Sequence, residues 1–218
     1  MKNWIIIFIA MLQCAPVFLS CSEYGGEQSF TSKPTTQTTL PDTCDDPEKN
    51  IRCCFAQMPD QLTSVMKIAP AGEPGERMII RGKITKSDGK TPVSDAIIYC
   101  YHTNERGIYA KKGGETGVHR WHGHLHGWCR TDEEGRYEIQ TIRPARYPSN
   151  NTPAHIHPIL WVEGREPFYL TDFVFSDDPL IDEKYLRYTR NYPGGTGVVD
   201  LKRNKAGIWE GERVIVIN

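Results

Sequence analysis

The sequence predicts an all-β fold, a two-sheet β-sandwich with long loops and few short helices. Three observations lead to this prediction. From residue 76 onward, short segments rich in β-branched and aromatic residues follow one another. Glycine, proline, aspartate and asparagine separate these segments, as is typical of turns between strands. No long segment shows a convincing helical period, so a sandwich is the architecture that we expect.

The first expected strand covers residues 77–85 and leads directly into the turn sequence KSDGK. A second turn sequence, DEEGR, introduces the strand expected at 137–142. Further strands are expected at 95–103, 154–164, 168–175 and 212–218. Only the stretches 45–64 and 178–191 are expected to contain a helical turn or two.

Residues 103–130 form the longest expected loop, with four histidines and six glycines. A loop of this length in a compact domain is usually functional or disordered, and its histidine and aromatic content argues against disorder. If the segment is extended, His122, His124 and His126 share one face. The cluster from His119 to His126 then has three possible roles. It could form a second metal site, it could carry protons at the mouth of a pocket, or its loop could only pack over a nearby site.

The N-terminus is expected to lie outside the fold. Residues 1–20 have an early lysine and an apolar segment, which is typical of a secretory signal peptide. The sequence FLSC resembles a bacterial lipobox, so we expect Cys21 to be lipidated, with an ordinary cleaved signal as the alternative. Residues 21–45 are expected to be a flexible tether and residues 46–218 the folded domain. The protein would then be an exported, membrane-anchored lipoprotein facing the periplasm or the cell exterior.

Charge and cysteine content restrict the partners and the redox state. The net charge of −1 and the lack of a basic cluster give no support to nucleic-acid binding. In an oxidising compartment, Cys44 can form a disulfide with Cys53 or Cys54. Cys100 lies in an apolar strand pattern, so we expect it to be a buried, inert thiol.

Two histidines one residue apart, His155 and His157, lie within an apolar segment that is expected to be a strand. Side chains two residues apart on a strand point the same way, so the two imidazoles can share one metal ion. A hydrogen-bonded histidine pair is the alternative. Tyr109 and Tyr147 are the candidate further donors, because phenolate is a hard, anionic ligand that suits Fe(III). A set of two histidines and two tyrosines would leave the ion with an open coordination position.

The chain resembles the intradiol ring-cleavage dioxygenases, the family of protocatechuate 3,4-dioxygenase and catechol 1,2-dioxygenase. The resemblance extends over residues 70–186. It is carried by residues 72–109, which end in ERGIY, and by the segments TDEEGRYEIQTIRPARYP, PAHIHPILWVEG and FYLTDFVFSDDPLIDE. It implies that Tyr109 and His155 are equatorial ligands of Fe(III), and that Tyr147 and His157 are axial ligands. It also implies that Tyr147 accepts a substrate proton.

Two positions depart from the family pattern. Thr152 stands where relatives carry an arginine, and Asp172 where they carry a glutamine. Both are expected at the substrate-binding side of the site, where they would make the pocket more negative and weaken the binding of carboxylated catechols. Arg146, beside Tyr147, is the candidate catalytic residue that would supply the missing positive charge. Arg130 and Arg143 are further candidates for this charge, and a solvated surface arginine is the alternative for each of the three.

The function expected from the resemblance is that of a non-haem Fe(III) dioxygenase. It would use O2 to cleave a catechol between its two hydroxylated carbons and give a muconate-type diacid. Two alternatives remain: a β-sandwich that binds iron or catecholate without catalysis, and a prealbumin-like module without a metal. Because the four ligand positions are all present, the last alternative is the weakest.

Overall fold

The computed structural model describes residues 44, 46 and 50–218 of the 218-residue chain. The predicted signal peptide 1–20, the lipidation site Cys21 and nearly all of the predicted tether 21–45 lie outside the described residues. Within the described part of the chain, no helix has both the length and the apolar character needed to span a membrane.

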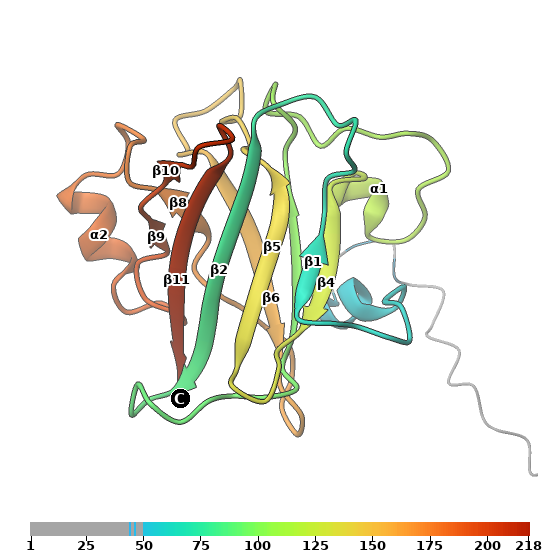
Figure 1. Ribbon diagram of the computed structural model, residues 1–218. Helices are drawn as coiled ribbons and strands as arrows, with labels where there is room; N and C mark the ends of the chain where they lie inside the picture. Colours follow the sequence, from blue (N-terminus) through green and yellow to red (C-terminus); the bar gives the residue numbers. More distant parts are fainter. Residues whose placement is uncertain (1–43, 45, 47–49) are drawn as a thin grey trace, which may run out of the picture. The chain divides into compact units, whose positions relative to one another are not determined.

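Two β-sheets face each other, as predicted for a sandwich (Figure 1). One sheet has the order β1 (Val65–Lys67), β5 (Arg136–Ile142), β2 (Arg77–Lys86), β11 (Trp209–Ile217) and β10 (Lys202–Arg203). The other has the order β4 (His126–Arg130), β3 (Ile97–His102), β6 (His155–Trp161), β8 (Phe173–Phe175) and β9 (Val198–Val199), with β7 (Phe168–Tyr169) paired to β6. The predicted fold class is confirmed.

The core lies between the sheets because the strands alternate apolar and polar residues. On β2, Met78, Ile80 and Ile84 are fully buried, whereas Arg81 and Lys83 are exposed. The central strand β3 is buried on both faces, because a second cluster that includes Cys54 and Phe55 covers its outer side.

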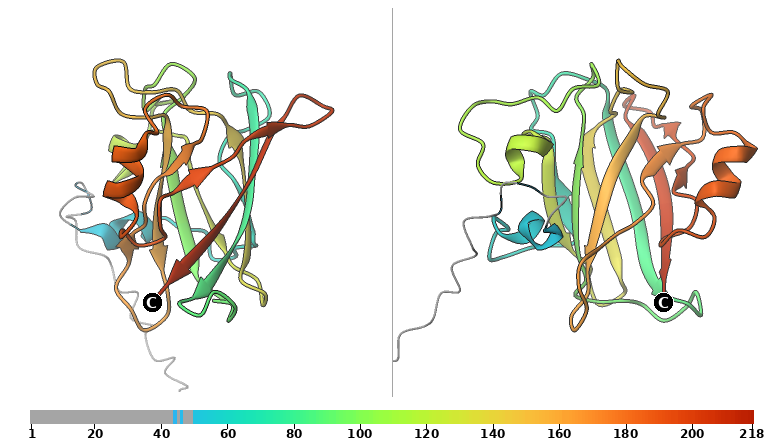
Figure 2. Two further views of the ribbon diagram at one scale, coloured as in Figure 1. Left: turned by 90° about the vertical axis from the view of Figure 1, so that its left-hand side faces the viewer. Right: turned by 180° about the vertical axis from the view of Figure 1, so that it is seen from behind.

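Three short helices complete the described structure. They are η1 (Ile51–Phe55), α1 (His119–His122) and α2 (Glu183–Thr189). Figure 2 shows η1 and α1 at the β4 end of the sandwich and α2 at the opposite end. The helical turns predicted in 45–64 and 178–191 are therefore η1 and α2. The segment expected as one strand at 168–175 is divided into β7 and β8.

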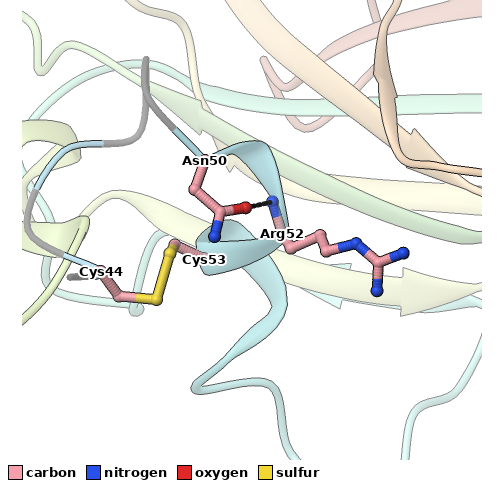
Figure 3. Close-up of a disulfide and its surroundings, with 4 residues drawn as sticks. All are labelled: Cys44, Asn50, Arg52 and Cys53. Carbon is pink, nitrogen blue, oxygen red and sulfur yellow. Dashed lines mark hydrogen bonds between the residues drawn. A yellow bond between two sulfur atoms is a disulfide. The ribbon is translucent and has the colours of Figure 1, made fainter. Parts of the chain in front are cut away.

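A disulfide joins Cys44 to Cys53, one of the two pairings that the sequence left open. Figure 3 shows this bridge beside η1, where the Asn50 side chain caps the helix by accepting a hydrogen bond of 3.1 Å from the Arg52 backbone N–H. Residue 44, although within the predicted tether, is thus covalently attached to the domain. Cys100 is a buried free thiol, as predicted, and burial raises its pKa well above the usual range.

The loop expected at 103–130 contains two elements that were not predicted, α1 and β4. His122 ends a helix and His126 begins a strand, so the three alternating histidines do not share one extended face. Their ring nitrogens have separate partners: His124 contacts Glu73 and the Ala110 carbonyl, and His126 contacts the Gly123 carbonyl. The arrangement does not bring His122, His124 and His126 together as a second metal site.

Candidate metal centre

Strand β6 places His155 and His157 on the same side of its sheet, as the alternation predicted. Ile156, between them, points to the core and is fully buried. Strand β3 pairs with β6 on one side and β8 pairs with it on the other, so neither histidine can shift along the sheet. The two Nε2 atoms lie 2.9 Å apart.

Tyr109 reaches the same point from a tight loop that follows β3. The loop closes on Asn104, whose side chain accepts hydrogen bonds from the backbone N–H groups of Arg106 and Ile108. At Gly107, φ is +78°, and a Cβ there would lie 1.9 Å from the carbonyl oxygen of Arg146. Only glycine allows this close approach, which brings the loop against the residue before Tyr147.

Tyr147 is positioned by a clamp that the sequence did not reveal. The buried Asp178 carboxylate accepts two hydrogen bonds from Arg146, at 2.7 and 2.9 Å. It also accepts one from the backbone N–H of Ala154 at 2.9 Å. Arg146 precedes Tyr147 and Ala154 precedes His155, so a single carboxylate fixes the chain immediately before two of the candidate ligands.

The four predicted ligand side chains converge on one point. The His157 Nε2 atom lies 2.9 Å from the Tyr109 hydroxyl and 3.1 Å from the Tyr147 hydroxyl, and the two hydroxyls contact each other. The His155 Nε2 atom lies 3.1 Å from the Tyr147 hydroxyl. Donors bound to one ion at about 2.0 to 2.1 Å are separated by about 2.8 to 3.4 Å at octahedral and tetrahedral angles. The spacings that include a nitrogen, 2.9 to 3.1 Å, fall within this range.

The two histidines direct their Nε2 atoms to the same point. His155 Nδ1 contacts the Pro153 carbonyl at 2.6 Å, and His157 Nδ1 contacts the Asp172 carboxylate at 2.9 Å. Both partners only accept, so each Nδ1 carries a proton and each Nε2 is directed away from it, toward the point where the four donors meet. The two phenol hydrogens can serve the two Nε2 atoms, but a cation at this point can be bound by all four donors at once. The donor set therefore fits a metal ion.

The two phenols fit the same interpretation. Burial raises the pKa of Tyr109 well above its usual value, and the hydrogen bond with Tyr147 raises it further. Burial also raises the pKa of Tyr147, against a smaller lowering effect from Tyr109. In the protein alone both side chains are neutral, so a strongly charged ion is required to hold them as phenolates. Fe(III), the ion predicted from the sequence, has the necessary charge.

Asp172 is also close to the two histidines, and these three side chains could be taken for a metal-binding triad. Its carboxylate, however, is hydrogen-bonded to Nδ1 of His157, on the opposite side of the ring from the point where the four donors meet. Asp172 therefore orients the ring and increases the electron density on Nε2. The hydrogen bond to His157 lowers the pKa of Asp172, although burial, the largest single effect, raises it.

A cavity of about 720 Å³ opens onto three of the four donors. Its lining contains no lysine or arginine among the residues that the structure describes. Aromatic rings predominate, and Trp121, with an exposed fraction of 60%, stands at the solvent side. The lining consists of Asp46, Tyr101, Tyr109, Trp121, His122, Tyr147, His157 and Tyr169.

Three rings are stacked along one wall of this cavity. The His122 ring lies 3.6 Å from the Tyr101 ring with 9° between their planes, and Tyr101 in turn lies 4.6 Å from His157 with 24° between planes. Burial lowers the pKa of His122 to about 3, with a smaller effect from His157, so the ring is neutral at pH 7. The sequence analysis identified His122 only as part of a histidine cluster and did not single out Tyr101.

The other predicted site residues are not part of the cavity lining. The Arg146 guanidinium is bound to Asp178. The backbone N–H of Thr152 donates to the Asn150 side chain at 3.1 Å, and Asp172 contacts His157. The structure therefore brings together Tyr109, Tyr147, His155 and His157, and gives Arg146 and Asp172 positions from which they support those ligands.

Comparison with known proteins identifies the family. Residues 54–192, well over half of the chain, match the family Dioxygenase_C, described as Dioxygenase, which comprises the intradiol ring-cleavage dioxygenases. The chain is 34% identical over 117 residues to the protocatechuate 3,4-dioxygenase beta chain of Burkholderia cepacia, covering 50% of this chain and 49% of that one. It is 30% identical over 131 residues to catechol 1,2-dioxygenase 1 of Acinetobacter lwoffii, covering 52% and 40%.

Solved structures support the fold. The dioxygenase domain of a carbohydrate-binding fusion protein from Streptomyces sp. SirexAA-E superimposes with a TM-score of 0.53 and 18% identity, over 70% of this chain and 86% of that one. Catechol 1,2-dioxygenase from Acinetobacter sp. ADP1 gives a TM-score of 0.51 and 23% identity, over 72% and 57%. The chain spans half or less of the length of the two curated relatives described above. On the family match and the shared fold, the chain belongs to the intradiol ring-cleavage dioxygenases.

Proposed function

We propose that the protein is a non-haem Fe(III) dioxygenase that cleaves a catechol between its two hydroxylated carbons. Both atoms of O2 enter the product, a muconate-type diacid. The observation that carries this proposal is the convergence of two imidazole nitrogens and two phenol oxygens beside a cavity, at spacings of 2.9 to 3.1 Å in the pairs that include a nitrogen. Family membership supports the same reaction class.

The protein's own residues would have distinct tasks in this reaction. A ferric ion held by Tyr109, Tyr147, His155 and His157 would act as a Lewis acid that binds the catechol oxygens and makes the ring reactive toward O2. Tyr147, which lines the cavity, would be the proton acceptor for a catechol hydroxyl. Asp172 keeps the Nδ1 proton of His157 in place and thereby keeps Nε2 directed at the ion.

A visible absorption spectrum of the iron-reconstituted full chain tests the metal site. Phenolate bound to Fe(III) gives a charge-transfer band, which Tyr109→Phe or Tyr147→Phe should weaken. Tyr188→Phe is the matched control, because Tyr188 is 69% exposed and is hydrogen-bonded to Tyr192 away from the cavity. Protein without stoichiometric iron, or a band that none of these variants changes, would contradict the proposed centre.

Addition of 4-methylcatechol without oxygen, followed by oxygen, tests the reaction. The proposal predicts a new catecholate band that oxygen bleaches, uptake of one O2 per ring cleaved, and incorporation of both atoms of 18O2 into the diacid. A coloured complex that is stable in oxygen would favour the alternative function, a β-sandwich that binds iron or catecholate without catalysis. The cavity lining supports this alternative, because no described lining residue offers a positive charge to the substrate ring.

We also propose that the protein is exported and anchored to a membrane through lipid on Cys21. The support is the N-terminal sequence, with its early lysine, apolar segment and FLSC motif. Expression in a bacterium with labelled palmitate should give a labelled membrane-associated protein, and Cys21→Ser should abolish the label and release the protein. Unlabelled wild-type protein in the cytosol would refute the proposal.

A further inference from the structure

His122 is a buried polar side chain that the proposed reaction does not use. Its exposed fraction is only 5%, yet it lines the same cavity as Tyr109, Tyr147 and His157. The ring is held flat against Tyr101, with 3.6 Å between centroids, so it cannot turn its polar edge away. A buried polar group in this position requires a partner or a function.

One ring nitrogen of His122 already has a partner. Its Nδ1 lies 2.8 Å from the Tyr99 hydroxyl, and Tyr99 is fully buried. No other hydrogen-bond partner of this hydroxyl occurs among the described residues. A buried hydroxyl whose hydrogen finds no acceptor is costly, so Tyr99 donates and Nδ1 accepts. The proton of the neutral His122 ring is therefore on Nε2.

The Nε2–H group of His122 has no hydrogen-bond partner in the described part of the chain. It is also not among the unpaired polar atoms sealed in the interior. Because His122 lines the cavity and its Nδ1 faces Tyr99, Nε2–H is a donor available to the cavity. The ring is separated from His157 by the Tyr101 ring, which places this donor to the side of the metal centre rather than at it.

The cavity is larger than a single catechol ring requires. Its volume of about 720 Å³ is in the range of pockets for drug-sized ligands. Trp121 and Tyr169, with exposed fractions of 60% and 47%, line the same cavity and offer flat apolar surface to a substituent. Asp46 is the one carboxylate among the described lining residues. A substituent with a carboxylate would lose its hydration there without gaining a lysine or arginine in the described lining.

We propose that His122 is a specificity-determining residue whose Nε2–H binds an uncharged oxygen acceptor on the side group of the catechol. The substrate class is then catechols with a neutral carbonyl- or ether-bearing substituent, such as an amide, ester or ketone. This inference rests on the proposed function, because it requires the diol of the same molecule to occupy the metal centre. Tyr99 is the positioning residue that fixes the proton on Nε2.

Three ligands with the same diol test the proposal: 4-ethylcatechol, 3,4-dihydroxyphenylacetamide and 3,4-dihydroxyphenylacetate. Their dissociation constants are measured by calorimetry on the full chain loaded with Ga(III), which binds catechols without redox chemistry. The amide should bind about 2- to 12-fold more tightly than the ethyl compound, as expected for one neutral hydrogen bond. The acetate should bind more weakly than the amide, because its charge has no cationic partner.

Two substitutions of His122 distinguish the effect of its N–H donor from the effect of its ring. His122→Phe keeps the stack on Tyr101 but removes the donor, so the amide and the ethyl compound should bind equally. His122→Gln retains an N–H at nearly the same place and should restore the preference. Tyr99→Phe should reduce it, because Nδ1 can then carry the proton. The 15N spectrum of metal-free protein reports the same proton directly and should show Nε2–H in the wild type.

The results that would overturn the proposal are distinct from failure of the proposed function. An unchanged amide preference in His122→Phe, equal binding of the amide and the ethyl compound by the wild type, or a proton on Nδ1 would each refute the role of His122. If none of the three catechols binds the Ga(III)- or Fe(III)-loaded chain, the proposed function fails and this inference fails with it.

Discussion

The strongest prediction about how the fold supports the metal centre concerns the Asp178 clamp, the hydrogen bonds that Asp178 accepts from Arg146 and Ala154. The Asp178 side chain is only 4% exposed and accepts four hydrogen bonds, two from Arg146 and one each from the backbone N–H groups of Ala154 and Leu180. Asp178→Ala leaves two backbone donors without this acceptor, the buried N–H of Ala154 and the partly buried N–H of Leu180. Each costs about 1–3 kcal/mol. The Arg146 side chain is 39% exposed, so water replaces part of its lost interaction, and this adds at most about 1 kcal/mol.

We therefore expect Asp178→Ala to lower the free energy of unfolding by about 3–5 kcal/mol, measured by urea denaturation. The neighbouring residue supplies the matched control. Asp177 is 52% exposed, and its ion pair with Arg143, at 2.6 Å, is the one recorded for it in the described part of the chain, so Asp177→Ala should cost less than about 1 kcal/mol. Iron affinity should fall in Asp178→Ala and stay unchanged in Asp177→Ala. Equal costs for the two variants, or normal iron binding by Asp178→Ala, would refute the clamp.

Three further predictions follow from the site. The backbone donors and Arg146 hold the pKa of Asp178 below its ordinary 3.8, although burial, the largest single effect, opposes them. The ionised Asp178 carboxylate therefore contributes to the free energy of unfolding above about pH 4, and this contribution is lost as the pH falls through the pKa of Asp178 in the folded protein. The difference in unfolding free energy between wild type and Asp178→Asn should shrink below about pH 4, which a series of urea denaturation curves in acid measures. Asp172→Ala should weaken iron binding by about 10- to 100-fold in competition with a chelator, and Asp172→Asn by less, because the amide keeps an acceptor oxygen; equal affinities for both variants and wild type would contradict this role. Gly107→Ala should cost at least about 2 kcal/mol in thermal or urea unfolding, because its Cβ would overlap the Arg146 carbonyl. Gly89→Ala, with φ of +67° but open space around it, should cost clearly less.

The alternation of side chains on a strand was sufficient to predict the histidine pair. His155 and His157 share a face because a β-strand has a period of two, and Ile156 confirms which face is the core. The two tyrosines could be proposed from their donor chemistry and from the resemblance, but their convergence depends on loops. Nothing in the local sequence indicates that Gly107 packs against the residue before Tyr147.

The predictions that relied on proximity in sequence were less successful. Arg146 is adjacent to Tyr147, yet its guanidinium binds Asp178 rather than lining the cavity, because neighbouring side chains of an extended segment point in different directions. Asp178 lies 24 residues from Ala154, and no local pattern indicates their hydrogen bond. Strand β4 was missed because it is short and has few apolar residues, so its pairing with β3 is carried by the backbone.

The position of the centre in the chain has a consequence for stability. Tyr147 lies in the connection from β5, in one sheet, to β6, in the other, and Tyr109 follows β3. An ion bound by both phenols would join positions 38 residues apart in the chain. Because the ligands come together only in the folded chain, the free energy of metal binding adds to the stability of the fold. A bound metal ion would then hold the two sheets together at the connection from β5 to β6, where the chain passes from one sheet to the other.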